Sequence, residues 1–246
     1  MTEGASDVDA PIGPHEDEPH DASFGTRLNW LRAAVLGAND GIVSTAGLVV
    51  GVAGATTNRT AILVAGVAGL FAGALSMAAG EYVSVSTQRD SEKALLEKER
   101  RELAETPEEE LAELAGLYVQ KGLTDELALE VAQQLTEHDA LGAHAEAELG
   151  IDPDDLTNPW HAAWASMVAF TAGALLPLLT IVLVPDGARV PVTMLTVVVA
   201  LAGTGWLSAT LGASPVGKAV VRNVGGGLLA MLVTYLIGTL VGGQVG

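Results

Sequence analysis

The sequence of 246 residues contains no cysteine. Disulfide bonds, thiolate metal sites and cysteine nucleophiles are therefore excluded. Aromatic residues make up only 4% of the chain, whereas glycine is abundant, with 29 residues. Small residues allow membrane helices to approach each other closely, so this composition suits a membrane protein better than the aromatic-rich core of a soluble one.

The sequence also lacks the motifs of common enzymes. The hydrolase patterns G-x-S-x-G and H-E-x-x-H do not occur, and neither does a Walker A loop. None of the 5 histidines has a glutamate three residues before it, as a ferritin-like di-iron site requires. ATP-driven pumping and ordinary enzymatic catalysis find no support, and no prosthetic group is expected.

Basic residues are scarce, and the formal net charge of -18 comes from 30 acidic residues against 12 basic ones. The acidic residues gather in two segments, with seven in positions 1–21 and twenty between Asp90 and Asp155. The mean hydropathy of the whole chain is nevertheless +0.38. The charge therefore describes two aqueous segments, and the rest of the chain is strongly apolar.

Five apolar stretches are long enough to cross a membrane. Each has about 20 residues or more, as a helix needs to span a hydrocarbon core of roughly 30 Å. They lie at residues 33–54, 61–87, 161–184, 190–212 and 219–242. The alternative is a set of buried helices in a soluble protein, which so many apolar stretches in a short chain disfavour. The sequence predicts an all-α membrane protein with five transmembrane helices.

The distribution of lysine and arginine predicts the orientation. If the N-terminus lies inside, ten of the 12 basic residues fall on inner segments or inner helix ends, and only Arg59 and Arg189 fall outside. Cytoplasmic segments carry an excess of Lys and Arg. The insert between the second and third spans is then cytoplasmic, and the C-terminus is external.

These patterns divide the chain into four parts. Residues 1–26, rich in acidic residues, proline and glycine, predict a disordered tail and contain no recognisable signal peptide. Residues 27–89 hold the first two transmembrane helices, 90–158 form a cytoplasmic helical domain, and 159–246 hold the last three transmembrane helices. With no organelle signal and an Ala/Gly-rich prokaryotic style, the plasma membrane of a prokaryote is the expected location.

The insert is predicted to be helical throughout. Residues from Ser91 to about Ala104 continue the second span as a polar helix. Thr106 and Pro107 form a typical helix start, with a capping threonine and proline at the first position. Thr124 begins a longer helix that ends at Gly150. Short amphipathic helices of this kind form a small bundle when a partner or a metal supports them.

Three residues of the first two spans are candidates for a transport path. Asp40 lies inside the first span, where a carboxylate costs about 2.5–3.5 kcal/mol, so an ion path or proton relay is the first hypothesis. The alternative is a solvated position near the interface. Met77 offers a soft thioether suited to late transition metals, or is an ordinary core methionine. Glu81, one turn further, is either a third polar group of the path or marks its cytoplasmic mouth.

The insert carries candidate metal ligands. Glutamates three residues apart share a helix face, and two such pairs are followed by a histidine one turn before another glutamate. These residues are Glu99, Glu102, Glu110, Glu113, His144 and Glu148. Several carboxylates with an imidazole suit Fe²⁺, Mn²⁺ or Zn²⁺. The alternative is a solvated acidic face held by the interleaved Lys and Arg residues.

Two ordered motifs carry a resemblance to a known family. The first span contains NDGIVST at residues 39–45, and the second contains SMAAGEYVS at residues 76–84. A glutamate-rich insert follows, then ELG at residues 148–150 and Asn158-Pro159 before the third span. Over residues 27–243 the sequence resembles the vacuolar iron transporter family.

The resemblance implies a five-span homodimer in the lipid bilayer that exports Fe²⁺, and often Mn²⁺, from the cytosol in exchange for protons. It implies a path at the dimer interface that uses an aspartate and a methionine, which match Asp40 and Met77. It also implies that glutamates of a cytoplasmic domain bind the metal, and these align with Glu99, Glu102, Glu110, Glu113 and Glu148. No nucleic acid is expected as a partner.

Two positions depart from the plant members of that family. Gly69 stands where they carry a further membrane glutamate, which argues against a shared proton-coupling residue. His144 stands where they have methionine, which exchanges a soft ligand for a borderline one. The expected function is a secondary transporter that lowers cytoplasmic Fe²⁺. In one alternative Mn²⁺ is the main substrate, and in another the protein is a non-transporting metal sensor or buffer.

Overall fold

The structure, a computed structural model, describes the backbone of residues 23–212 and 214–245 and the side chains of residues 33–212 and 214–243. Every regular element in these residues is a helix. In chain order they are α1 (Ser23–Ala55), α2 (Arg59–Glu105), α3 (Pro107–Gln120), α4 (Asp125–His144), the π-helix η1 (Ala145–Leu149), α5 (Pro159–Leu183), α6 (Arg189–Leu211) and α7 (Val216–Val245). Residues 1–22 of the predicted acidic tail lie outside the described residues.

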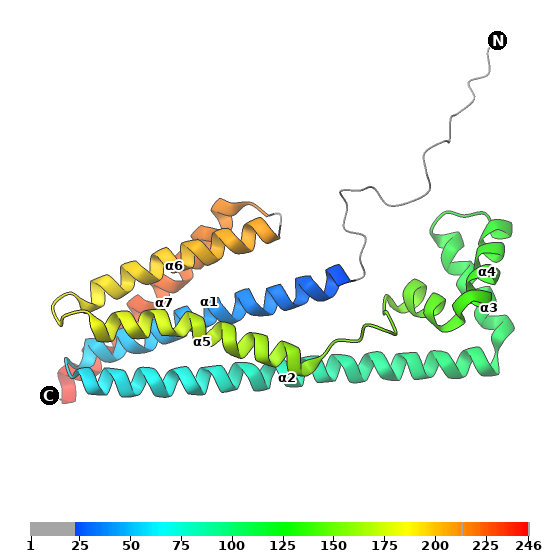
Figure 1. Ribbon diagram of the computed structural model, residues 1–246. Coiled ribbons are helices and arrows are strands. Elements are labelled where there is room, and N and C mark those ends of the chain that lie inside the picture. The colour runs from blue at the N-terminus through cyan, green and yellow to red at the C-terminus, as the bar shows by residue number, and fades with distance from the viewer. Residues whose placement is uncertain (1–22, 213, 246) are drawn as a thin grey trace, which may run out of the picture.

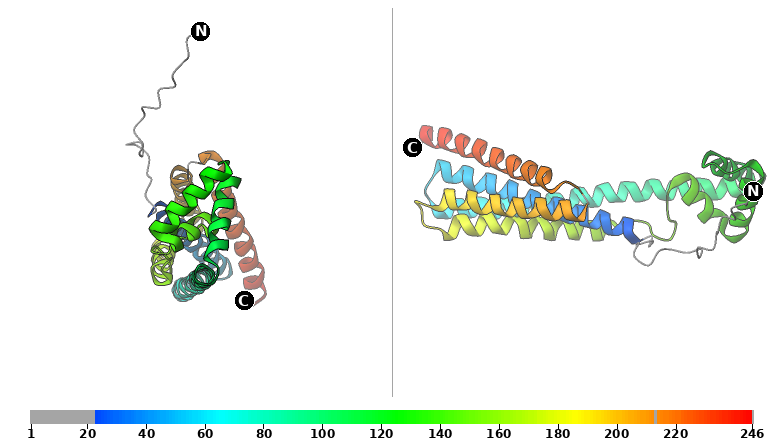
Figure 2. Two further views of the ribbon diagram at one scale, coloured as in Figure 1. Left: turned by 90° about the vertical axis from the view of Figure 1, so that its right-hand side faces the viewer. Right: turned by 90° about the horizontal axis from the view of Figure 1, so that it is seen from above.

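Five helices, α1, α2, α5, α6 and α7, are long and apolar enough to cross a membrane. They lie side by side at one end of the molecule (Figures 1 and 2). α1 contacts each of the other four and so forms the centre of the bundle. The predicted all-α membrane protein with five transmembrane helices is confirmed.

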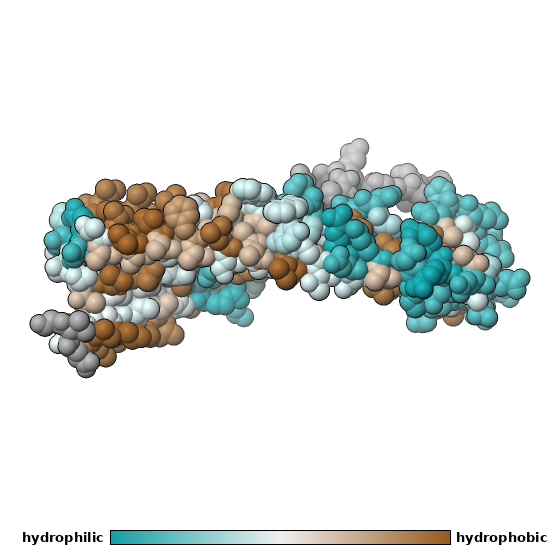
Figure 3. Space-filling model, turned by 90° about the horizontal axis from the view of Figure 1, so that it is seen from below, coloured by the Kyte–Doolittle hydropathy of each residue, from teal (hydrophilic) through white to brown (hydrophobic). Residues whose placement is uncertain are grey.

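Apolar side chains cover the outside of this bundle. Hydrophobic residues spread over the five-helix end of the molecule, whereas hydrophilic residues cover the end formed by α3 and α4 (Figure 3). On the bundle, Phe71, Leu183 and Leu240 are 63%, 73% and 68% exposed. A surface of this kind is stable where hydrocarbon surrounds it.

Glycines bring α1 close to two neighbours. A Cβ atom at Gly41 would overlap the carbonyl oxygen of Phe170 in α5. A Cβ atom at Gly238 of α7 would likewise overlap the carbonyl oxygen of Gly51 in α1. The absence of side chains therefore lets the helix backbones meet, as is common in membrane bundles.

α2 joins the bundle to the insert without interruption. Its 47 residues extend over about 70 Å, more than twice the thickness of a hydrocarbon core. Asn58 caps its start by accepting a hydrogen bond from the N–H of Ala61. The polar second half of α2 projects from the bundle and carries α3, α4 and η1 at its far end (Figure 1).

α3 and α4 pack against each other around a small core of Leu114, Ala115 and Ala132. Thr124 caps α4 as predicted, because its hydroxyl accepts a hydrogen bond from the N–H of Leu127. Thr106 occupies the N-cap position of α3 and Pro107 follows it, as predicted, but the threonine hydroxyl makes no capping hydrogen bond. Its hydroxyl instead donates to the carbonyl oxygen of Glu102, one turn back in α2, at 3.2 Å, a local bond that threonine commonly makes.

The single helix predicted from Thr124 to Gly150 is interrupted. Asp139 has an extended backbone, with φ of -158° and ψ of 93°. Residues 145–149 then widen into the π-helix η1, a form that often occurs at functional sites. Gly150 ends the segment in the left-handed conformation, with φ of 64°, which glycine adopts readily.

The opposite end of the bundle is held together by charged groups. Arg189, at the start of α6, is only 3% exposed. It forms an ion pair with Asp186 and donates to the carbonyl oxygen of Thr57 at 3.3 Å. Asp186 also pairs with Arg59 at 3.2 Å. These contacts tie the turn between α1 and α2 to the turn between α5 and α6.

Candidate functional site

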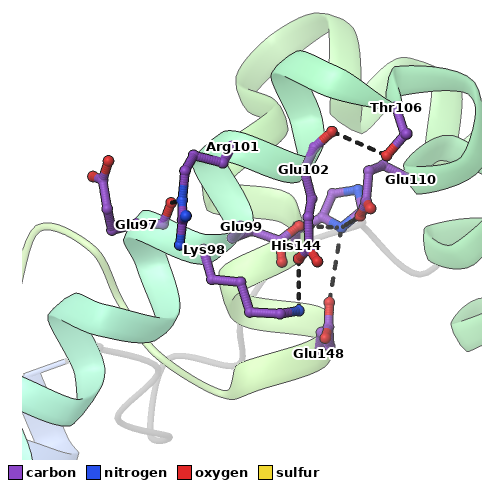
Figure 4. Close-up of polar contacts among 9 residues, drawn as sticks. All are labelled: Glu97, Lys98, Glu99, Arg101, Glu102, Thr106, Glu110, His144 and Glu148. Carbon is purple, nitrogen blue, oxygen red and sulfur yellow. Dashed lines mark hydrogen bonds and ion pairs between the residues drawn. The ribbon is translucent and has the colours of Figure 1, made fainter.

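Three carboxylates converge on the imidazole of His144 within the insert (Figure 4). The Nδ1 atom of His144 lies 2.9 Å from Oε1 of Glu99, 3.7 Å from Oε2 of Glu110 and 4.0 Å from Oε2 of Glu148. Each of these groups comes from a different element, with Glu99 on α2, Glu110 on α3, His144 at the end of α4 and Glu148 in η1. The cluster therefore forms only when the insert folds.

Local sequence explains why these glutamates point inward. Glu99 lies three residues after the buried Leu96, and Glu110 lies four residues before the buried Leu114. Residues at these spacings share a helix face. Both glutamates thus occupy core positions, with exposed fractions of 3% and 7%. Charged residues are rarely buried in this way unless another charge or a metal compensates them.

Burial and mutual repulsion raise the pKa values of the cluster carboxyls. Burial raises the pKa of Glu99 to about 7, and the neighbouring Glu148 and Glu110 add to this rise. Burial, together with nearby acidic residues, also raises the pKa values of Glu110 and Glu148. Burial lowers the pKa of His144. The imidazole therefore favours its neutral form, in which a ring nitrogen has a free lone pair.

The cluster is short of positive charge. Lys98 pairs with Glu102 at 2.7 Å, and it lowers the pKa of Glu99 less than the neighbouring glutamates raise it. A divalent cation would supply the missing charge. One ligand atom each from Glu99, His144 and Glu148 lie within 4.8 Å of one another. Ligand atoms about 2.0–2.2 Å from a metal ion lie roughly 3–4 Å from one another, so a small inward movement of these side chains would let all three contact one ion.

The other two predicted ligands of the insert lie at the edge of the cluster. The side chain of Glu102 is 37% exposed and is held by Lys98. Glu113 is exposed on α3, yet it lies near enough to raise the pKa values of Glu110 and Glu148. The structure thus gathers Glu99, Glu110, His144 and Glu148 around one point and leaves Glu102 and Glu113 beside it.

A second candidate site lies within the bundle. Asp40 and Met77, from α1 and α2, line the same cavity of about 210 Å³. Gly69 and Gly73 of α2 also line it. A Cβ atom at Gly69 would overlap the side chain of Leu48, and one at Gly73 would overlap the ring of Phe170. The two glycines therefore help to leave a space that a carboxylate and a thioether both line.

Glu81 does not line this cavity. It lies one turn beyond Met77 on α2 and is partly buried. Three hydroxyl side chains that the sequence had not singled out do line the cavity, namely Ser44, Thr45 and Ser76. Ser44 and Thr45 lie about one turn after Asp40, and Ser76 directly precedes Met77. These positions are the signal that would have identified them.

α2 contributes residues to both sites. Met77 and Glu99 are 22 residues apart, which is about 33 Å along a continuous helix. The insert cluster is therefore remote from the cavity, but the two are connected by a rigid element.

Comparisons with known proteins place the chain in a family. The sequence model of the VIT family matches residues 31–239. A vacuolar iron transporter of Acanthamoeba castellanii is 43% identical over 92% of this chain and 83% of its own length. Vacuolar iron transporter homolog 1 of Oryza sativa subsp. japonica is 39% identical over 93% of this chain and 82% of its own. VIT-like transporter 1b of Glycine max is 36% identical over 88% and 78%, respectively. With the five-helix bundle, these similarities establish that the chain belongs to the VIT family.

Proposed function

We propose that this protein is a secondary transporter that moves Fe²⁺ out of the cytosol in exchange for protons. The observation that carries the proposal is the uncompensated cluster of the buried Glu99 and His144 with the exposed Glu148, which shares α2 with the cavity of Asp40 and Met77. The relatives are named iron transporters, which supports iron as the cargo. As a member of a family of transporters, the chain is not an enzyme.

The donor atoms of the two sites favour a transition metal. Carboxylate oxygens and a neutral imidazole in the insert suit Fe²⁺, Mn²⁺ and Zn²⁺. The thioether of Met77 is a poor ligand for Na⁺, Mg²⁺ or Ca²⁺ and a better one for later transition metals. In this proposal the insert gathers the ion and the Asp40–Met77 cavity passes it through the membrane.

Asp40 is the candidate for exchanging metal against protons. A carboxylate within a membrane span is stabilised when it binds either a cation or a proton. Binding of Fe²⁺ from the cytosolic side displaces the proton from Asp40. Protonation of Asp40 from the outer side then releases the metal there, so that protons move inward as the metal moves outward.

We also propose an orientation in the membrane, an oligomeric state and a location for the protein. The insert faces the cytosol, the C-terminus is external, and two copies form a homodimer with the path between them. The distribution of Lys and Arg supports the orientation, and α7 ends at the end of the bundle remote from the insert (Figure 2). In this proposal the second copy replaces lipid on part of the apolar surface of α2, which includes the exposed Phe71 and Leu75. The relatives have "vacuolar" in their names, whereas for this chain we propose a prokaryotic plasma membrane, where export has the same direction relative to the cytosol.

Two other functions are possible outcomes of the transport experiment described below. His144 is a harder donor than a thioether, which favours Mn²⁺ as the main substrate. The separation of about 33 Å between cluster and cavity also suits a sensor or buffer, in which the insert binds metal without transport.

Proteoliposomes that contain the purified protein distinguish these functions. We expect external Fe²⁺ to quench a trapped metal-sensitive dye, a trapped pH dye to report counter-movement of protons, and Asp40→Asn to abolish both signals. Thr193→Val is the matched control, because Thr193 is fully buried in α6 but does not line the cavity. Metal binding without flux would contradict transport, and parallel runs with Mn²⁺, Co²⁺ and Zn²⁺ identify the substrate.

A further inference from the structure

The segment that carries His144 and Glu148 does not continue smoothly from α4. The extended backbone of Asp139 breaks the helix. A new helical segment starts at residue 140 and runs through η1 to Leu149. The first residues of any helix lack intrahelical acceptors for their N–H groups, so this segment requires a cap of its own.

Asp139 supplies that cap. Its Oδ1 atom accepts a hydrogen bond from the N–H of Gly142 at 3.0 Å. Gly142 is the third residue after Asp139, which is the usual relation between an N-cap side chain and the N–H group that it satisfies. A Cβ atom at residue 142 would overlap the Asp139 carboxylate. Gly142 is therefore the residue type that leaves room for this cap.

We infer that Asp139 is a positioning residue for the metal cluster. Its cap holds the first turn of the segment through the N–H of Gly142, two residues before His144, whose imidazole approaches Glu99 on α2. Asp139 is exposed and contributes no ligand atom to the group of Glu99, His144 and Glu148. The inference rests on the proposed role of that group in binding metal.

A rival explanation uses the charge of Asp139 instead of its hydrogen bond. The carboxylate lines a surface cavity of about 760 Å³, which Glu146, Asp152 and Asp154 also line. Its negative charge would then attract cations without shaping the segment. Asparagine and serine keep the cap but remove the charge, so substitutions separate the two explanations.

The experiment measures Mn²⁺ affinity by calorimetry on the full-length protein in detergent. We expect Asp139→Ala to weaken binding about five-fold, as the loss of one cap predicts. Asp139→Asn and Asp139→Ser should stay within about two-fold of the parent protein. Thr124→Ala is the matched control, since it removes the cap at the other end of α4 and should leave Mn²⁺ affinity unchanged.

Gly142→Ala provides an independent route to the same defect, because the new methyl group displaces the Asp139 carboxylate. Its loss of affinity should match that of Asp139→Ala, and the double variant should be no weaker than either single one. An equal loss in Asp139→Asn and Asp139→Ala would overturn the capping role in favour of charge. Full affinity in Asp139→Ala, while Glu148→Gln binds weakly, would overturn the inference alone. Full affinity in both Glu148→Gln and Glu99→Gln would instead refute the proposed metal cluster.

Discussion

The Nδ1 atom of His144 lies 2.9 Å from Oε1 of Glu99, and the two side chains are only 0% and 3% exposed. This contact joins the end of α4 to the polar half of α2. Neither atom has a well-formed hydrogen bond within the described residues. A buried carboxylate facing a neutral imidazole is stabilised by a proton or by a metal ion. Protonation and metal binding therefore compete at this point.

Removing the charge of Glu99 should weaken metal binding and stabilise the metal-free protein. We expect Glu99→Gln to weaken Mn²⁺ binding at least about ten-fold, because a ligand with a full charge is lost. The same variant should raise the thermal stability of the metal-free protein, since it removes the cost of burying a carboxylate and the repulsion from Glu148 and Glu110. Calorimetry measures the Mn²⁺ affinity, and thermal unfolding in detergent measures the stability. Glu105→Gln, an exposed position at the end of α2, is the control, and unchanged Mn²⁺ affinity in Glu99→Gln would rule out Glu99 as a ligand.

The stability of the metal-free insert should fall as the pH rises. The folded protein raises the pKa of Glu99 from 4.5 to about 7, so it binds the proton more tightly than the unfolded chain does. This contribution is full below about pH 4.5 and is lost as the pH rises through 7, with a total of roughly 3 kcal/mol. The raised pKa values of Glu110 and Glu148 act in the same direction. The lowered pKa of His144 acts oppositely, because its contribution is lost as the pH falls below 6.5.

Hydrogen exchange of residues 139–149, corrected for the intrinsic rate, tests this prediction. Protection in the metal-free protein should be lower at pH 8 than at pH 5.5, and Mn²⁺ should restore it with release of protons. Glu99→Gln should remove much of the pH dependence. Protection that increases with pH would show that His144, and not the carboxyls, dominates the pH dependence of stability.

Removing the sulfur of Met77 should change metal preference. Leucine has nearly the same volume as methionine, so Met77→Leu is expected to leave the fold intact. We expect transport of Co²⁺ to fall several-fold more than transport of Mn²⁺, because the later metal gains more from a soft donor. Parallel flux assays in proteoliposomes give the ratio. Met194→Leu, at a partly buried position in α6 outside the cavity, controls for packing, and an unchanged ratio in Met77→Leu would exclude the thioether as a ligand.

Charge loss at the other end of the bundle should affect stability and not metal binding. Asp186→Ala leaves the buried guanidinium of Arg189 with the carbonyl oxygen of Thr57, and we expect a loss of about 1–3 kcal/mol. Arg59→Ala breaks the exposed pair with Asp186, which is worth about 0–1 kcal/mol, and a long hydrogen bond to the carbonyl oxygen of Val184 at 3.4 Å. Thermal unfolding in detergent compares the two variants. An equal and small effect of both would mean that burial of Arg189 does not depend on its pairing with Asp186.

The sequence alone was sufficient to predict the five membrane-spanning helices and the chemistry of the candidate residues. The length of each apolar stretch determines whether a helix spans a bilayer, and this property is local to the stretch. The cost of a carboxylate within a span likewise made Asp40 conspicuous before its surroundings were known. The start of α4 at Thr124 followed from the same local chemistry of helix caps.

Only the tertiary structure decided which of the predicted groups meet. Glu99 and Glu102, like Glu110 and Glu113, are equivalent by spacing, and the packing of α2 against α3 and α4 turns one member of each pair inward. The break at Asp139 was likewise not predicted, because the apolar residues from Thr124 to Gly150 follow one helical pattern. Contacts between elements distant in the chain depend on side-chain packing, which residue spacing along one helix does not specify.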